Sequence, residues 1–492
     1  MTALLLMAFT LSTTPEVEAA RLVRERFEVA GRTVPNEDAQ LMAAAQRLSA
    51  LAATRTASDA AGLLAVTEAV SRAGGWDASP TAIVIKAPRH QLLAELARQK
   101  DLAAEPSTAM GVGVSENGSR AALCVLLAVR KFELRPLARA FPKPPGRLSV
   151  CGALSQPLET AELFVTLPSG GVERQPMAKA DDGVCAPFFP SARGRYVVEV
   201  LGRGPRGPEV AALFFVDVGA SSVSADQQFV EPASAAEARR AVTARINALR
   251  RTMGLVPVSP DKVLDAVAQA YADRLAAEGF FSHVDPTGGD LKSRLAAARY
   301  RFSAAGENLG SSSGPLAAHF GIEHSPGHRL NLLERDHRAL GLGLATRAGD
   351  GLTVLVQVLA APVRDDGADP LEVAYGALAE ARAKKGLPAL TRHPALEALA
   401  VEHARRCLSR DKLSAELEPG KKLHERVFEV VTDAREASVD LAIVESAQAM
   451  PSSRNLADLR YSRVGVGLVR GDSPTYGDDK LWVVIVYANR DE

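Results

Sequence analysis

Apolar side chains recur with a helical period in two long segments of the chain. In the first segment they are three or four residues apart, which places them on one face of a helix: Leu264, Val267, Ala268, Tyr271 and Leu275. The sequence SPD directly before them is typical of a helix start. Near the end of each segment a GxG sequence precedes a β-branched run, LTVLVQVL or LWVVIVYA, and predicts a hairpin. Helices that flank an antiparallel sheet predict an α-β-α sandwich in each segment.

The two segments are copies of one module. A Gly-Leu pair and two apolar helix positions recur at a constant spacing of 132 residues: Gly254 and Gly386, Leu255 and Leu387, Leu264 and Leu396, Ala268 and Ala400. The GxG sequences GLGLA and VGVGLV also correspond. A fainter third copy lies near the N-terminus, where GRTVPNEDAQLMAAAQRLSALA precedes MGVGVSENGSRAALCVLLAV. Repeats of this kind predict α-β-α modules at residues 20–135, 239–362 and 370–490.

Between the first and second copies the pattern changes to a period of two. The runs AELFVTL, GRYVVEVL and VAALFFVDV alternate and are separated by Gly- and Pro-rich turns. They predict a small all-β sandwich of immunoglobulin-like size at residues 147–219, followed by a polar linker at 220–238. The predicted fold class is therefore α+β multidomain.

Length and charge narrow the class of protein. With 492 residues the chain exceeds the about 250 to 300 residues at which single cores stop growing, so several domains are expected. Lys+Arg and Asp+Glu are equal at 58 each, which predicts that nucleic acid is not a partner. Beyond the N-terminus, no segment approaches the ~18 uncharged apolar residues of a membrane span, so an integral membrane protein is not expected.

Residues 1–19 resemble a short signal peptide. An apolar run is followed by the sequence VEA as a candidate cleavage site, although no Lys or Arg precedes the run. The alternative is an apolar cap on the first helix. We therefore expect a secreted or cell-envelope protein, with the cytoplasm as the alternative. Cys151 and Cys185 flank β-like sequence and predict either a disulfide, if the chain is exported, or two small buried hydrophobic residues.

Five of the nine histidines lie between residues 283 and 337. Together with nearby glutamates they give four candidate ligands on short motifs: His283 in FFSHVDP, Glu307 in AAGENLG, and Glu323 and His328 in GIEHSPGHR. Two imidazoles and two carboxylates suit Zn²⁺ or another divalent cation, with His283 and His328 as the metal ligands. They suit an acid–base pair equally well. In a third interpretation, each imidazole bonds a carboxylate and only fixes loops to the sheet.

The repeat allows an internal comparison of these positions. The third copy has Ala415 and about Ser453 in the places of His283 and His328, and it has no GEN sequence, yet its helix and hairpin patterns remain. The polar set is therefore not required to form the fold.

Four motifs in order, FFSHVDP, AAGENLG, HSPGHRLNLL and GLGLA, resemble the bacterial type of the CAP superfamily, the SCP-like domain of cysteine-rich secretory proteins, antigen 5 and pathogenesis-related proteins. The resemblance implies an α-β-α sandwich whose central cleft holds His283, Glu307 and His328. Glu323 best matches the fourth cleft residue, with His324 as a competitor, because IEH stands where a Trp-x-Asn sequence is usual. For the family it implies extracellular proteins that bind lipids, sterols or protein partners, some with a divalent cation in the cleft.

These observations predict an exported binding module with one complete CAP domain, two degenerate copies and a β-sandwich spacer. The cleft of the middle copy is expected to hold a divalent cation or a small ligand, and no catalytic residue is assigned. One alternative is a metal-dependent hydrolase, in which a glutamate activates a metal-bound water. Another is a purely structural adaptor of the cell envelope.

Overall fold

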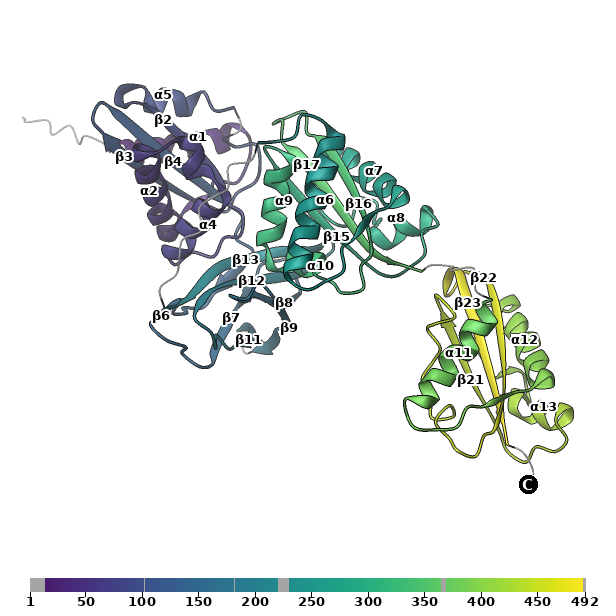
Figure 1. Cartoon of the computed structure of the whole chain (residues 1–492). Helices are drawn as coiled ribbons and strands as arrows, with labels where there is room; N and C mark the ends of the chain where they lie inside the picture. Colours follow the sequence, from purple (N-terminus) through teal and green to yellow (C-terminus); the bar gives the residue numbers. More distant parts are fainter. Residues whose placement is uncertain (1–13, 101, 181, 220–229, 364–368, 490–492) are drawn as a thin grey trace, which may run out of the picture. The chain divides into compact units, whose positions relative to one another are not determined.

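The computed structural model describes residues 14–100, 102–180, 182–219, 230–363 and 369–489 (Figure 1). Most of the predicted signal peptide and of the predicted linker lies outside these ranges. The chain forms two compact units, residues 1–294 with 306–359 and residues 295–305 with 360–492. None of the helices in the described ranges is long and apolar enough to cross a membrane.

A four-stranded sheet with one strand order occurs three times. The orders are β1-β3-β4-β2, β14-β16-β17-β15 and β18-β22-β23-β21. In each sheet the first strand has two residues and pairs in parallel with the strand that is third in chain order within that sheet. The strands are β1 Asn36–Glu37, β2 Thr81–Pro88, β3 Ala109–Asn117, β4 Arg120–Ala128, β14 Ser259–Pro260, β15 Phe302–Ser312, β16 Ala339–Thr346, β17 Thr353–Pro362, β18 Thr391–Arg392, β21 Ala437–Val444, β22 Arg463–Ser473 and β23 Gly477–Ala488.

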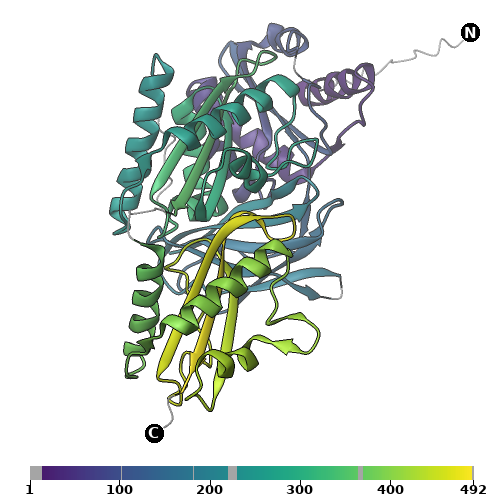
Figure 2. The same cartoon turned by 90° about the vertical axis from the view of Figure 1, so that its right-hand side faces the viewer.

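Helices cover both faces of these sheets, which Figure 2 shows from a second direction. In the first module α1 and α5 share one apolar core with the sheet, while α2 and α4 share another. In the third, α11 packs on one face, and α12 and α13 on the other. In the middle module α6 and α9 pack on one face, and α7 lies against β16. The helices of the first module are α1 Pro15–Val29, α2 Ala39–Thr54, α3 Ala57–Ala61, α4 Leu63–Arg72, η1 Arg89–Gln91 and α5 Leu92–Ala97. Those of the middle and third modules are α6 Ala235–Thr252, α7 Lys262–Glu278, α8 Leu291–Ala297, α9 Pro315–His324, α10 Pro326–Leu332, α11 Pro370–Ala383, α12 Pro394–Ser409 and α13 Leu423–Val430; a short β19–β20 pair (Glu416–Glu418, Lys421–Lys422) precedes α13. The predicted combination of helices and sheets in several domains is confirmed.

The repeated GxG sequences mark a close approach of helix and strand. A Cβ atom added to Gly341 would lie 2.1 Å from the carbonyl carbon of Leu264 in α7. The equivalent atom on Gly465 would lie 2.2 Å from the carbonyl carbon of Leu396. In the first module Gly111 stands in the same relation to Leu41, again at 2.1 Å. Only glycine fits these positions, because the helix backbone occupies the space of a side chain.

The segment between the first and middle modules forms two sheets around one apolar core. The strand orders are β10-β11-β7-β5 and β6-β13-β12-β8-β9. The strands are β5 Phe132–Leu134, β6 Ala140–Phe141, β7 Leu148–Leu154, β8 Thr160–Thr166, β9 Val172–Pro176, β10 Ala178–Ala180, β11 Gly183–Phe188, β12 Gly194–Gly204 and β13 Gly207–Val218. The β-sandwich thus begins with β5, earlier than residue 147, because β5 pairs with β7. The immunoglobulin-like character of this module stays a prediction.

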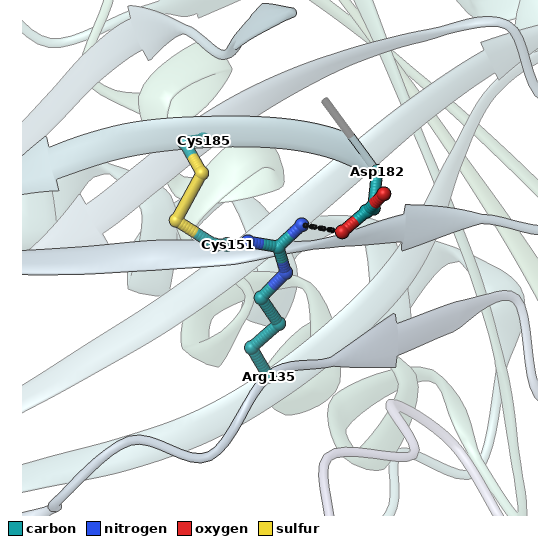
Figure 3. Close-up of a disulfide and its surroundings, with 4 residues drawn as sticks. All are labelled: Arg135, Cys151, Asp182 and Cys185. Atoms are coloured by element: carbon teal, nitrogen blue, oxygen red, sulfur yellow. Dashed lines mark hydrogen bonds and ion pairs between the residues drawn. A yellow bond between two sulfur atoms is a disulfide. The ribbon is translucent and has the colours of Figure 1, made fainter. Parts of the chain in front are cut away.

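A disulfide links Cys151 in β7 to Cys185 in β11 (Figure 3). The two residues face each other in the antiparallel register, with Cα atoms 4.2 Å apart. The nearby side chain of Arg135 donates to Asp182 at 3.3 Å. Cys124 and Cys407 are free and buried. Of the two interpretations of Cys151 and Cys185, the structure therefore has the disulfide.

Candidate functional site

The loop after α7 holds His283 in place through its neighbours. The hydroxyl of Tyr271, in α7, donates to the carbonyl oxygen of Ser282 at 2.6 Å. The hydroxyl of Ser282 donates to the carbonyl oxygen of Val284 at 2.6 Å. The two bonds fix the main chain on either side of His283.

His283 is part of a chain of charged and polar groups. Its Nδ1 lies 2.9 Å from Oε1 of Glu307 in β15, and Oε2 of Glu307 accepts from Arg294 at 2.6 Å. The Arg294 guanidinium lies over the ring of Tyr271, 3.5 Å from its centroid. The Glu307 side chain is only 3% exposed. A carboxylate on one imidazole nitrogen fixes the orientation of the ring and directs the other nitrogen elsewhere.

His328, in α10, lies close enough to His283 for the two rings to repel each other when charged. Removal from water lowers the pKa of His328 to about 3, and the repulsion from His283 contributes to this shift. The imidazole therefore stays neutral at ordinary pH, although the residue retains some exposed surface. No hydrogen bond to its ring is shown from any described part of the chain, so its nitrogens are not committed to the main chain.

The other histidines of the cluster have structural partners. Nδ1 of His324 bonds the carbonyl oxygen of Phe320 at 2.8 Å, and Nδ1 of His337 bonds that of Asn331 at 3.1 Å. His319 is fully buried and contacts the amide of Gln357 at 3.0 Å. These three imidazoles hold the module together, whereas His283 and His328 border the site.

Glu323 faces a different set of groups. Its carboxylate lies 3.7 Å from Nε2 of His319 and 3.6 Å from a guanidinium nitrogen of Arg329. Glu323 and His319 are four residues apart on α9, and therefore lie on one side of that helix. The structure thus brings His283, Glu307 and His328 together. The Glu323 carboxylate lies instead beside His319 of α9 and Arg329 of α10.

A divalent cation would have few ligands here. Both oxygens of Glu307 already have partners, which leaves the imidazoles of His283 and His328. Over the ranges that the structure describes, no group of three or more His, Cys, Asp and Glu side chains has an arrangement that could hold a metal. Protein zinc sites use three or four such ligands. The residues present therefore do not form a closed metal site.

The β-sandwich covers one side of the site, which the sequence did not indicate. Glu199, on the outer face of β12, is fully buried and accepts from the Ser325 hydroxyl at 2.6 Å and from the Gly327 amide at 2.8 Å. Arg329 donates to the carbonyl oxygen of Gly170 at 2.9 Å. The β12–β13 turn reaches the loop of His283, where the Val284 amide donates to the carbonyl oxygen of Arg206 at 3.3 Å. The only signal in the sequence is a glutamate inside the apolar run VVEVL.

Matching hydrogen bonds identify the equivalent positions in the third module. The Asn331 amide donates to the carbonyl oxygen of Glu307, and that of Asn455 donates to Val439. Val439 therefore replaces Glu307, and Asn455 replaces Asn331. The bond from Tyr271 to the residue before His283 likewise has its equivalent in the bond from His403 to the residue before Ala415. The third module keeps the scaffold bonds and lacks the three polar site residues.

Comparison with known proteins identifies the modules. The model of the Cysteine-rich secretory protein family, CAP, matches residues 243–359 and 375–487. The chain carries two CAP domains. The middle CAP domain contains the site, and the C-terminal CAP domain is the copy without it.

Individual relatives also match parts of the chain. A stretch of 100 residues is 35% identical to the uncharacterized membrane protein YlbC of Bacillus subtilis (strain 168), and it covers 20% of this chain and 29% of that protein. Among solved structures, an outer surface protein from Borrelia burgdorferi is 21% identical, with 26% of this chain and 96% of that chain covered and a TM-score of 0.25. An extracellular SCP-domain protein from Bacillus anthracis is 17% identical, with 47% and 89% covered and a TM-score of 0.23. At these values the structures add no argument to the family match.

Proposed function

We propose that the middle CAP domain is a binding module that takes a small polar ligand between His283 and His328. The observation that carries this proposal is the contrast among the imidazole rings: those of His319, His324 and His337 have hydrogen-bond partners, whereas among the described residues the ring of His328 has none. The internal comparison supports it, because the C-terminal CAP domain folds without the equivalent side chains. A polar side chain that the fold does not need is a candidate for binding.

The charge of the site favours a ligand with neutral hydrogen-bonding groups. The positive charge of Arg294 is opposed by Glu307, and the lowered pKa of His328 keeps that imidazole uncharged. A neutral imidazole offers one donor and one acceptor nitrogen. A hydroxyl or amide group of a ligand can both accept a hydrogen bond from the donor nitrogen and donate one to the acceptor nitrogen. The disulfide in the β-sandwich supports an exported location for the chain, since such bonds persist in oxidising compartments.

A divalent cation is the second candidate, and one observation favours it. Neutral imidazole is the form that binds metals, and the low pKa of His328 removes competition from protons. With only two imidazoles from the protein, such a cation would complete its coordination with water or with the ligand itself. The metal-dependent hydrolase, the alternative interpretation of the same motifs, depends on this cation.

The proposal predicts that both histidines contribute to binding. We expect His283→Ala and His328→Ala each to weaken binding at least about tenfold, which is the loss of one well-formed hydrogen bond or ligand. Calorimetric titration of the full chain with Zn²⁺ tests the cation, and ligand-observed NMR with small hydroxyl- and amide-bearing compounds tests the polar ligand. His90→Ala, an exposed histidine outside the site, is the matched control. If all three variants bind zinc and the small compounds equally, His283 and His328 have a structural role only, as the adaptor alternative requires.

A further inference from the structure

A second hollow lies between the N-terminal module and the β-sandwich, within the first compact unit. Its volume is about 750 Å³, and its wall includes α4, the segment after β5 and parts of β12 and β13. Small-molecule sites in proteins have volumes of about 300 to 1,000 Å³. The hollow is therefore large enough for an organic ligand, and it is separate from the site around His328.

Direct hydrogen bonds hold its two walls together. The Leu213 amide of β13 donates to the carbonyl oxygen of Trp76 at 2.8 Å. The Phe215 amide donates to the hydroxyl of Ser71, in α4, at 2.9 Å. The indole nitrogen of Trp76 donates to the carbonyl oxygen of Phe132. Because the walls are bonded before a ligand arrives, little ordering is required on binding.

Four arginines and two carboxylates line the hollow, so positive charge is in excess. Both carboxylates are already engaged: Asp217 bonds Arg195 at 2.8 Å, and Glu68 bonds both Arg195 and Arg72. Arg135, the third arginine, pairs at 3.3 Å with Asp182, which is 87% exposed and lies outside the lining. Exposed pairs of this kind contribute little and are easily exchanged.

Arg139 has no carboxylate partner among the described residues. Its guanidinium donates to the main-chain oxygens of Ser71, Gly74 and Gly75 at 3.3, 2.9 and 2.6 Å. These bonds use up to three of its five N–H groups. Burial lowers the pKa of Arg139 to about 10, so the side chain remains charged at neutral pH. A fixed, charged guanidinium with two remaining donors is suited to a carboxylate.

Apart from Gln40 and Ser71, the remaining side chains of the lining are apolar and partly aromatic. It includes Trp76, Leu134, Leu137 and Phe215. The guanidinium carbon of Arg195 lies 4.3 Å from the centroid of the Phe215 ring. An occupant would therefore combine a carboxylate with a planar apolar body.

From this arrangement we propose that the hollow between α4 and the β-sandwich binds an aromatic carboxylate, with Arg139 and Arg135 at the carboxylate and Trp76 and Phe215 at the ring. The inference is independent of the binding function of the middle CAP domain.

Calorimetric titration of the full chain with 2-naphthoate tests the ligand class. We expect saturable binding at least about tenfold tighter than that of 2-naphthamide, which lacks the charge, and of inorganic phosphate, which lacks the ring. Equal affinity for the amide would overturn the role of the carboxylate. Equal affinity for phosphate would overturn the role of the apolar body, and the lack of any saturable heat would overturn the site.

Two variants test the residues. Arg139→Lys keeps the charge and removes the planar fork, and Arg135→Gln removes an exposed charge at the rim; each is expected to weaken 2-naphthoate binding at least about tenfold. Arg251→Gln removes the same charge from an exposed side chain elsewhere and is expected to bind like the wild type. Circular dichroism establishes which variants fold, and the exposed position of Arg135 keeps that variant informative if Arg139→Lys unfolds. Wild-type affinity in the folded variants would refute the assignment.

Discussion

Replacing Gly341 with alanine is expected to destabilise the middle CAP domain by at least about 3 kcal/mol. The new Cβ atom would lie 2.1 Å from the carbonyl carbon and 2.3 Å from the carbonyl oxygen of Leu264. Both atoms belong to the backbone of α7, so no change of rotamer can relieve the contact, and the helix must move away from the sheet. Calorimetric unfolding of the full chain measures the effect. Tryptophan fluorescence would not report on this domain, because both tryptophans, Trp76 and Trp482, lie outside it.

Gly349→Ala is the matched control for this experiment. Gly349 lies on the loop after β16 in the same domain, and a Cβ atom added there would meet no atom within 4 Å. We expect this change to be close to neutral. Similar losses in the two variants would show that helix α7 does not lie against β16 as described. The equivalent change Gly465→Ala is expected to destabilise the C-terminal CAP domain in the same way, by its contact with Leu396.

The same contact explains why the repeat could be found in the sequence. A side chain is excluded wherever a helix backbone touches a strand, so each copy must keep glycine at that position and an apolar residue on the facing helix. Gly341 with Leu264 and Gly465 with Leu396 are such pairs, and in both the strand follows its helix far along the chain. Packing of this kind leaves a pattern that one sequence can reveal.

The site was less accessible to sequence reasoning, because it depends on how distant elements meet. His283 and Glu307 lie in short motifs and are bonded to each other. The bond between Arg294 and Glu307 follows from the direction of α8 against β15, which no motif specifies. The partners of Glu323 depend on which face of α9 packs inward. The apolar pattern of that helix is too weak to identify this face from the sequence.

The contact of the β-sandwich with the site was the feature least predictable from the sequence. Val198 and Val200 belong to the core of the β-sandwich, so the alternation along β12 places Glu199 on the outer face. From the sequence alone, a charged residue there is expected to meet water. Instead it is buried against Ser325 and Gly327, because α10 packs on this part of the sheet. Contacts between domains have no period, and a single sequence does not contain them.

The contact of Glu199 with Ser325 and Gly327 is expected to be strongest at low pH. Burial raises the pKa of Glu199 to about 7, from 4.5 for an exposed glutamate, and the bonds from Ser325 and Gly327 reduce the shift only in part. A raised pKa means that the docked state binds the proton more tightly. The resulting stabilisation is fully present below about pH 4.5 and is lost as the pH rises to about 7, a difference of about 3 kcal/mol. The Ser325 and Gly327 groups that bond the carboxyl carry no charge, and the neighbouring His328 stays neutral throughout this range because its pKa is about 3.

Hydrogen exchange of the Gly327 amide, corrected for the intrinsic rate, measures this dependence in the full chain. Between about pH 5 and pH 8 we expect protection to fall by roughly a hundredfold in the wild type and to change little in Glu199→Gln, whose side chain has the same shape and cannot ionise. Amides of β23 in the C-terminal CAP domain provide the internal control, since that strand belongs to the other compact unit. An identical pH dependence in the wild type and the variant would mean that Glu199 is ionised in the docked state, and that the β-sandwich holds the middle domain through Ser325 and Gly327 with equal strength at every pH in this range.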